Sequence, residues 1–350
     1  MQATEGTDAM RYEAPWWLPG GNAQTIWAAV GARRGPGTPV IWRRERWDTP
    51  DGDFVEVDFA VGSGSPAAGA LPAPIPQLGA PRPLLVVFHG LEGSSASHYA
   101  QTFAATAAER GWACAVPHFR GCGGELNRAP RAYHSGDYEE IGWMLQRLRQ
   151  QHGAGPMLAV GVSLGGNALL RWAQETGALA ARQLAALAAV SAPLDLAAGA
   201  RAIGMGFNRL VYTRMFLSTM KPKALAKLAQ HPGLFDGDAL RAARSLHAFD
   251  DAFTAPLHGF RDAQDYWRHC SAGPRMGEVQ LPALVLNALN DPFVPAASLP
   301  PPTALCGGSS VTYWRPTGGG HVGFPAGAFL PGHVRLMPNA VCDWLAQRLR

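Results

Sequence analysis

The chain has few cysteines and no long hydrophobic run. Its 350 residues include five cysteines, an odd number with no Cys-x-x-Cys pair. This pattern argues against a disulfide framework and a zinc knuckle, and it favours a reducing compartment. No stretch reaches the roughly 18 uninterrupted apolar residues that a membrane-spanning helix needs, and no secretory signal pattern is visible. We therefore predict a cytoplasmic protein.

Charged residues are also scarce. They make up 16% of the chain, and 30 basic residues against 26 acidic ones leave a formal net charge of +4. So small a surplus gives no reason to expect a nucleic-acid partner. Hydrophobic residues make up 47% of the chain, which is enough for a large buried core and excludes disorder for most of the sequence.

Short apolar runs alternate with helical patterns along the chain. This alternation predicts an α/β fold in which helices cover both faces of a mostly parallel sheet. One helix is expected to have Asp137 at its N-cap, with Glu140 three residues later and apolar residues at helical spacing beyond. The expected strands occupy residues 54–59, 84–88, 112–116, 157–160, 187–192, 284–288 and 311–314.

One interval between expected strands is too long for a single crossover. About 90 residues separate the strand 187–192 from the strand 284–288, whereas a crossover helix needs roughly a dozen or more. We therefore predict a helical lid over residues 195–280, inserted into a core formed by residues 1–194 and 281–350. The stretch 62–83 is rich in Ala, Pro and Gly, and we expect a long surface connection there.

Residues 161–165 read Gly-Val-Ser-Leu-Gly, the only G-x-S-x-G motif in the chain. The motif follows the expected strand 157–160 and precedes a helical stretch at 167–174. A strand, a sharp turn and a helix in this order expose a nucleophilic serine above the edge of a sheet. Gly161 and Gly165 allow the backbone and the helix to approach where a Cβ would clash. Ser163 is therefore the candidate nucleophile.

A serine hydroxyl needs a base to accept its proton and an acid to orient that base. His321 lies in a glycine-rich loop after the strand 311–314 and is the candidate base, with a structural loop histidine as the alternative. Asp291 follows the strand 284–288 and is the candidate acid, although its carboxylate could instead only cap a turn. In that case Asp195, after the strand 187–192, is the rival acid.

The oxyanion formed during acyl transfer needs two preorganised donors. The backbone amides of Leu91, in the loop after the strand 84–88, and Leu164, directly after the nucleophile, are the candidates. His89 also carries an imidazole, but before a glycine at a strand end we expect it to hold the loop by hydrogen bonds.

At these residues the chain resembles the YheT-like branch of the α/β-hydrolase superfamily, over nearly its whole length. The resemblance implies that Ser163, Asp291 and His321 form a catalytic triad and that the protein hydrolyses carboxylic esters, with lipase or esterase activity on acyl chains. The chain departs from the family pattern at two positions: Asn22 stands where a histidine is common, and Gly123 where a serine is common. Neither residue belongs to the implied triad. The motifs that carry the resemblance occupy residues 17–25, 89–94, 119–122, 133–136, 161–166, 249–256 and 290–293.

Basic residues gather in the predicted lid. Between residues 196 and 235 there is no acidic residue and there are six basic ones, namely Arg201, Arg209, Arg214, Lys221, Lys223 and Lys227. Two interpretations stay open. These side chains form a solvated helical face, or they make transient contact with anionic lipid head groups at a membrane surface.

Three other features carry less weight. Cys122 could serve as a nucleophile only if its neighbours lowered its pKa, and Ser163 is the stronger candidate. His118 and Cys122 make a poor pair of metal ligands, so we expect no metal. A G-x-G-x-x-G pattern at 318–323 is followed by Asp343, but it lies near the C-terminus instead of opening a first βαβ unit, so we expect no dinucleotide cofactor.

The sequence therefore predicts a serine hydrolase that acts on small-molecule acyl esters or lipids. The alternative from another class is a catalytically silent lipid-binding or sensing protein on the same fold. A thioesterase or a transacylase would use the same acyl-enzyme, because only the leaving or accepting atom differs.

Overall fold

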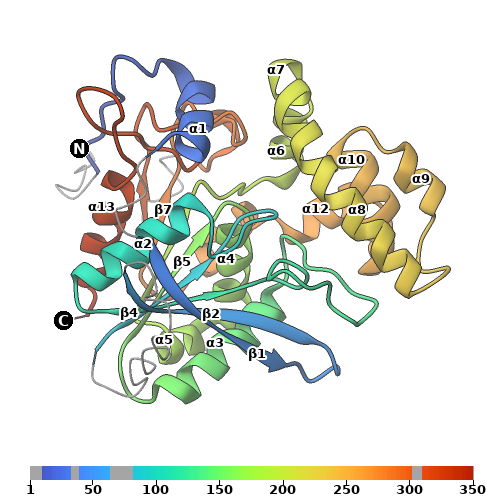
Figure 1. Ribbon diagram of the computed structural model, residues 1–350, viewed down its shortest axis with the longest axis horizontal. Coiled ribbons are helices and arrows are strands. Elements are labelled where there is room, and N and C mark those ends of the chain that lie inside the picture. The colour runs from blue at the N-terminus through green and yellow to red at the C-terminus, as the bar shows by residue number, and fades with distance from the viewer. Residues whose placement is uncertain (1–9, 33–38, 64–81, 302–309, 350) are drawn as a thin grey trace, which may run out of the picture.

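A central sheet of eight strands runs through the molecule (Figure 1). The computed structural model describes residues 10–32, 39–63, 82–301 and 310–349. Across the sheet the order is β1-β2-β4-β3-β5-β6-β7-β8, with the β1–β2 and β2–β4 pairs antiparallel and all others parallel. The strands are β1 Val40–Asp48, β2 Phe54–Ser63, β3 Leu84–Phe88, β4 Ala113–Pro117, β5 Met157–Val162, β6 Ala186–Val190, β7 Ala283–Leu286 and β8 Val311–Trp314.

The direction of strand addition reverses around β3. The chain passes from β3 to β4 on one side and then crosses back to β5 on the other side. In open α/β sheets such a reversal leaves a crevice at the carboxyl ends of the neighbouring strands. The loops after β3 and β5, which contain Leu91 and Ser163, therefore meet at one edge of the sheet.

The inner strands are buried on both faces. All five residues of β3 are apolar and fully buried. Leu84, Val86 and Phe88 belong to the core cluster on one face, and Leu85 and Val87 belong to the cluster on the other, because side chains along a strand alternate between faces. Continuous apolar strands of this kind are typical of parallel sheets covered by helices.

Helices cover both faces of the sheet. One face packs against α3 (Tyr138–His152) and α4 (Leu164–Thr176), and the other against α2 (His98–Glu109) and α13 (Leu336–Ala346). The helix α1 (Gly20–Val30) packs instead against the loops after β7 and β8. The short elements η1 (Gly177–Leu179), α5 (Ala180–Gln183) and η5 (Ala296–Ser298) lie in connections.

The predicted α/β fold with a mostly parallel sheet is confirmed. Each of the seven predicted strands begins within one residue of an observed strand. The strand β1 was not predicted, because five of its nine residues are charged and its edge position leaves most of them partly exposed. Most of the surface connection predicted for residues 62–83 lies outside the described residues.

The predicted N-cap position of Asp137 is confirmed, without a capping hydrogen bond from its side chain. Helix α3 begins at Tyr138, so Asp137 does stand at the N-cap, but its carboxylate makes no capping hydrogen bond and pairs with Arg131. A charged guanidinium offers a stronger partner than a neutral backbone amide.

Helices fill the stretch between β6 and β7, as predicted, and we call residues 196–278 the helical insertion. In Figure 1 the insertion lies on the side of the molecule opposite α13. A small hydrophobic core of its own, which includes Leu217, Leu240 and Phe249, holds its helices together. The insertion comprises α6 Leu196–Ile203, α7 Gly206–Asn208, η2 Arg209–Thr213, α8 Arg214–Gln230, α9 Gly237–Ala242, α10 Leu246–Phe249, η3 Asp250–Thr254, α11 Ala255–Leu257, α12 Ala263–Cys270 and η4 Gly273–Glu278.

Among the described residues, no helix combines the length and the apolar character needed to cross a bilayer.

Asn167 joins α4 to the helical insertion. Its buried Nδ2 donates to the carbonyl oxygens of Ser135 and Cys270, both at 2.7 Å, and its Oδ1 accepts from the amide of Ala272 at 3.0 Å. Asn167→Ala leaves these three backbone groups without their partner. We expect the free energy of unfolding to fall by about 3 kcal/mol in a urea titration.

The matched control is Gln150→Ala, which removes an exposed amide from α3. This change should alter the free energy of unfolding by less than about 0.5 kcal/mol. A loss in Asn167→Ala no larger than that of the control would contradict a stabilising role for the buried amide.

Candidate active site

Ser163 lies at the sharp turn between β5 and α4. Its backbone has φ +53° and ψ −120°, a conformation that a residue with a Cβ adopts only under strain. A Cβ on Gly165 would lie 2.4 Å from the carbonyl oxygen of His89, and a Cβ on Gly161 would lie 2.4 Å from that of Gly165. The two glycines are therefore required for the close approach of β5, α4 and the loop after β3.

His321 lies between Ser163 and Asp291. Its Nε2 is 2.9 Å from the Oγ of Ser163, and its Nδ1 is 2.9 Å and 3.1 Å from the two carboxylate oxygens of Asp291. The three side chains come from the loops after β5, β7 and β8, at the carboxyl ends of these strands. The structure thus brings together the three residues that the sequence indicated as nucleophile, base and acid.

Asp291 makes both kinds of contact that the sequence analysis considered. The carboxylate is buried, and its Oδ1 accepts from the amides of Phe293 at 2.8 Å and Val294 at 3.2 Å. Asp291 thus caps a turn and contacts His321 at the same time. The rival carboxylate of Asp195 instead accepts from the amide of Ala198 at 2.9 Å and caps α6.

Side chains from α1 and from the loop after β7 fix the loop that contains His321. Oγ1 of Thr25 accepts from the amide of His321 at 2.8 Å, Oε1 of Gln24 from that of Gly319 at 2.8 Å, and Oδ1 of Asn290 from that of Gly320 at 2.9 Å. Gln24 and Thr25 were not predicted as positioning residues. The only signal for them was their place in the motif at 17–25.

The amides of Leu91 and Leu164 have no acceptor within the described part of the protein. The backbone amides on either side of Leu91 do have acceptors. The amide of Gly90 donates to the hydroxyl of Tyr99 and that of Glu92 to the hydroxyl of Tyr133, both at 2.9 Å. Leu91 and Leu164 both line the same cavity as Ser163. Two unpaired donors therefore flank the serine.

His89 holds the loop after β3 in place. Its Nδ1 lies 2.7 Å from the carbonyl oxygen of Gly90, and its Nε2 accepts from the amide of Phe119 at 3.1 Å. Complete burial lowers the pKa of His89 to about 3, so the ring stays neutral. These contacts agree with the loop-holding role predicted for it.

The thiol of Cys122 is not activated, and the ring of His118 holds a backbone amide. Burial raises the pKa of the Cys122 thiol to about 12, so it is not an activated nucleophile. Nε2 of His118 accepts from the amide of Ser95 at 3.2 Å. In the described ranges, no group of three or more His, Cys, Asp or Glu residues is arranged to hold a metal ion.

A cavity of about 1170 Å³, including its open mouth, lies between the sheet edge and the helical insertion. Ser163 and His321 line it on the core side. The ring of Phe293 lies over that of His321, with 4.3 Å between centroids. The insertion contributes a mainly apolar wall, made by Leu196, Ile203, Phe216, Met220, Phe249 and Phe253.

Charged side chains also line the cavity. Nζ of Lys223 lies 2.9 Å from a carboxylate oxygen of Glu92, so the two form an ion pair between α8 and the loop after β3. Burial raises the pKa of Asp250 to about 6, and its carboxylate accepts from Thr254 and Trp267 at 2.7 and 2.9 Å.

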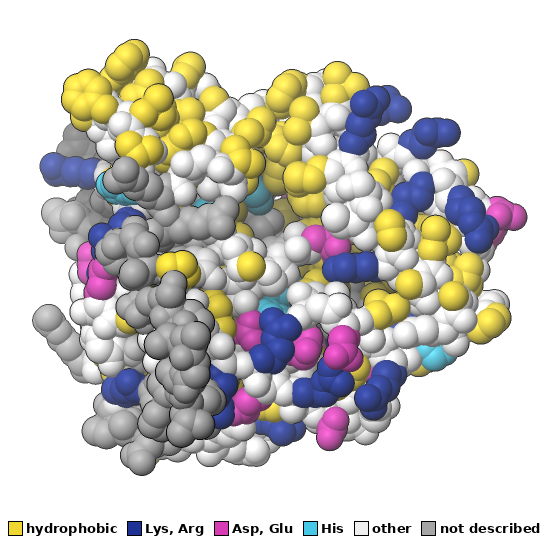
Figure 2. All heavy atoms as spheres, viewed as in Figure 1, with side chains coloured by type: hydrophobic (Ala, Val, Ile, Leu, Met, Phe, Trp, Pro, Cys, Tyr) yellow, Lys and Arg dark blue, Asp and Glu magenta, His cyan; other side chains and the backbone are white. Residues whose placement is uncertain are grey.

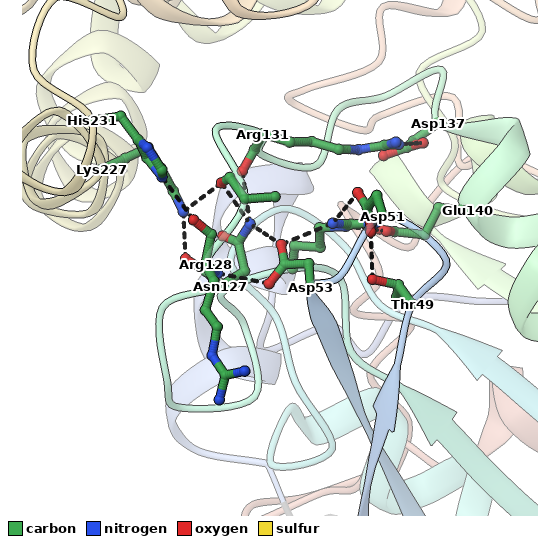
Figure 3. Close-up of polar contacts among 12 residues, drawn as sticks. Thr49, Asp51, Asp53, Asn127, Arg128, Arg131, Asp137, Glu140, Lys227 and His231 are labelled. Carbon is green, nitrogen blue, oxygen red and sulfur yellow. Dashed lines mark hydrogen bonds and ion pairs between the residues drawn. The ribbon is translucent and has the colours of Figure 1, made fainter.

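A polar network joins α8 to the core (Figure 3), and two of its members, Asn127 and Lys227, line the cavity. Nζ of Lys227 donates to the carbonyl oxygens of Asn127 and Ala129. Nδ2 of Asn127 in turn donates to Asp53 at 2.7 Å. Burial alone would raise the pKa of Asp53, but hydrogen bonds from Asn127 and from the amide of Arg128 lower it to about 2.

The six basic residues between residues 196 and 235 do not form one exposed face. Lys227 is buried, Lys223 pairs with Glu92, and Lys221 donates to the carbonyl oxygens of Arg241 and Ala243. These three cations contact the protein itself. Only the remaining three, Arg201, Arg209 and Arg214, are exposed.

Comparisons with known proteins agree with this architecture. A family model described as alpha/beta hydrolase fold matches residues 83–328. The chain is 39% identical over 321 residues to "Putative esterase YheT" of Escherichia coli (strain K12), with 89% of each chain covered. It is 28% identical over 293 residues to the human "Phospholipase ABHD3", with 83% of this chain and 68% of the relative covered.

A solved structure has the same fold at much lower identity. The esterase Pf2001 of Pyrococcus furiosus aligns with a TM-score of 0.51 at 12% identity, over 89% of this chain and 91% of that one. Likeness at this level concerns the fold alone.

The buried ammonium of Lys227 predicts a pH effect on stability. Burial lowers its pKa to about 8, against about 10.4 for lysine in an unfolded chain. Between these values the unfolded state binds more protons, so this group makes stability rise with pH. Lys227→Met removes the titration. The quantity to compare is the difference in free energy of unfolding between the wild type and Lys227→Met. We expect this difference to shift in favour of the wild type by up to about 3 kcal/mol from pH 8 to pH 10.5.

Urea titrations at several pH values across this window measure the effect. Lys221→Met is the matched control, because this lysine also lies on α8 and donates to backbone carbonyls but is only half-buried. A difference that stays constant over the window for Lys227→Met would show that the buried ammonium does not titrate there.

Proposed function

Because this chain belongs to the YheT-like α/β hydrolases, we propose that it cleaves carboxylic acyl esters with Ser163 as the nucleophile. The observation that carries the proposal is the hydrogen-bonded row of Ser163, His321 and Asp291, with both links at 2.9 Å. An intact row of this kind, open to a cavity, is what acyl transfer by a serine requires.

The reaction follows from the position of each group. The Oγ of Ser163 attacks the ester carbonyl while Nε2 of His321 takes its proton and then passes it to the departing alcohol. Asp291 keeps the ring of His321 oriented and stabilises its positive charge. Water, activated by the same ring, then attacks the acyl-serine and releases the carboxylic acid.

The oxyanion of each tetrahedral intermediate takes the amides of Leu91 and Leu164 as donors. Both amides are unpaired within the described residues and line the cavity beside Ser163. A donor without an internal partner needs no bond broken before it binds the developing charge, which is the condition for electrostatic preorganisation.

Esters with an apolar acyl chain suit the cavity best. The wall contributed by the helical insertion is mainly aliphatic and aromatic, and burial of each methylene of an acyl chain there contributes about 0.8 kcal/mol. The named relatives include a phospholipase, which supports lipids as the substrate class. We further propose that residues 195–280 act as the lid of this cavity.

Hydrolysis of a chromogenic ester series from acetate to palmitate tests the proposal. We expect turnover that peaks at one chain length and falls by a factor on the order of 10⁴ or more in Ser163→Ala. Ser218→Ala, which removes an exposed hydroxyl from α8, is the control and should keep wild-type activity.

The outcomes separate the alternatives. Equal turnover by the wild type and Ser163→Ala would overturn the mechanism. Binding of esters without turnover would favour the silent lipid-binding protein. Faster cleavage of thioesters, or acyl transfer to an added alcohol, would identify a thioesterase or a transacylase with the same nucleophile.

Matched substitutions at two carboxylates test the role of the acid. Asp291→Asn removes the charge that faces Nδ1 of His321, and we expect kcat to fall roughly 10³- to 10⁴-fold. Asp195→Asn makes the same chemical change at the cap of α6. Because asparagine caps helices as well as aspartate does, kcat should change less than about twofold. Equal losses in steady-state assays of the two variants would refute the assignment of Asp291.

A further inference from the structure

Exposed hydrophobic side chains are concentrated at one end of the molecule. Among the described residues, ten large hydrophobic side chains are exposed, and nine of them lie in segments that surround the carboxyl edge of the sheet. Only Leu179, in η1, lies elsewhere. Single exposed hydrophobic residues are common on protein surfaces, but such a concentration marks an interaction site.

The first group lies on α1 and the segments packed against it. Trp17 joins these segments, since its ring packs edge-on against Trp27 at 5.2 Å and its Nε1 donates to the carbonyl oxygen of Gly327 at 3.2 Å. The exposed side chains of this group, which we call the α1 rim, are Trp16 (79% exposed), Val30, Phe329 (76%) and Leu330.

The second group lies at the start of the helical insertion. It follows α6 and continues through α7 and η2 into the first turn of α8. Its exposed side chains, which we call the insertion rim, are Met205 (68% exposed), Phe207, Leu210 and Met215. The ninth exposed side chain, Leu289, lies two residues before the candidate acid, in the loop after β7.

The two rims meet beside the candidate active site. The hydroxyl of Tyr212, on η2, donates to Oδ1 of Asn22, on α1, at 2.8 Å. The ring of Tyr212 packs against Phe293 at 4.5 Å, and Phe293 covers His321. In Figure 2 hydrophobic side chains crowd two raised areas at the top of the molecule, on either side of a notch.

The insertion rim carries charge of one sign, whereas the α1 rim is uncharged and begins three residues after the exposed Glu13. The segments 14–32, 196–220 and 322–334 contain no Asp or Glu. They contain the exposed Arg201, Arg209 and Arg214, for which no ion pair is found among the described residues. The surface therefore combines apolar side chains with uncompensated positive charge.

We propose that the two rims dock this protein on the surface of a lipid bilayer that contains anionic lipids. Apolar side chains next to arginines are the composition that binds the boundary between head groups and acyl chains. A second copy of the chain fits less well, because a two-fold interface would bring the same arginines together. Docking would place the cavity that His321 lines next to the lipid layer.

Vesicle flotation tests this surface with the full-length chain. The probes are vesicles of phosphatidylcholine alone and vesicles with about one third phosphatidylglycerol. We expect binding to the anionic vesicles that weakens as salt is added. Measurements on Ser163→Ala as well as the wild type keep the result independent of hydrolysis, so failure of docking and failure of the proposed function can be told apart.

Two sets of substitutions separate the charged and the apolar contributions. The triple change of Arg201, Arg209 and Arg214 to Gln should weaken binding to anionic vesicles about 100-fold, since each cation near the surface contributes roughly a factor of five. Trp16→Ser combined with Phe329→Ser and Leu330→Ser should weaken binding at least tenfold. Leu179→Ser, which removes a side chain that is 55% exposed elsewhere, is the control and should leave binding unchanged.

Turnover of a short, water-soluble ester should stay at the wild-type level in the arginine variant, the apolar variant and Leu179→Ser, because none of the substituted side chains lines the cavity. Three results would overturn the proposal. The first is no flotation with anionic vesicles, and the second is flotation that Leu179→Ser reduces as much as the rim variants do. The third is a dimer, seen by light scattering, that the rim variants dissociate while vesicles are not bound.

Discussion

The row of hydrogen bonds from Ser163 through His321 to Asp291 depends on three parallel strands that end at one edge of the sheet. β5, β7 and β8 belong to one continuous parallel array, in which β6 lies between β5 and β7. Because parallel strands present all their carboxyl ends together, loops whose residues lie up to 158 positions apart in sequence reach the same place. The helices, the two core clusters and the buried strands keep that edge rigid. A shift of about 1 Å in any of the three loops would break a 2.9 Å contact.

Positioning of the imidazole also relies on a distant part of the chain. Gln24 and Thr25 on α1 hold the amides of Gly319 and His321 almost 300 residues later. Gly319 and Gly320 have φ values of +138° and +62°, and a side chain on either would collide with neighbouring atoms. The glycines let the loop fold tightly, and α1 then supplies the acceptors that such a tight loop lacks. The motif at the start of the chain thus acts through the loop of His321.

The helical insertion is tied to the core around the cavity by polar groups that are mostly buried. Lys227 donates to the carbonyl oxygens of Asn127 and Ala129. Asn167 donates to the carbonyl oxygen of Cys270 at the end of α12, and Tyr212 donates to Asn22 on α1. These contacts hold the apolar side chains of the insertion in place across the cavity from Ser163. The six basic residues between residues 196 and 235 divide into three that bind the protein and three that face outward. The outward arginines are the ones that lie beside exposed hydrophobic side chains, which gives the rims their mixed character.

The sequence by itself determined the features that depend on near neighbours. The turn at Ser163 was predicted because Gly161 and Gly165 lie two residues to either side of it. The strands were predicted because buried parallel strands are continuously apolar. Asp291 and His321 were predicted from their places just after such strands. The edge strand β1 was missed because its many charged residues hide the apolar pattern.

Only the tertiary structure decided which groups meet across long separations. The sequence could not indicate that Thr25 would hold His321, that the amide of Leu91 would stay unpaired between two bonded neighbours, or that Asp195 would cap α6. It also could not divide the cations of α8 into buried and exposed ones. Contacts of this kind depend on how helices and loops pack in space, and spacing along the chain contains no information on that packing.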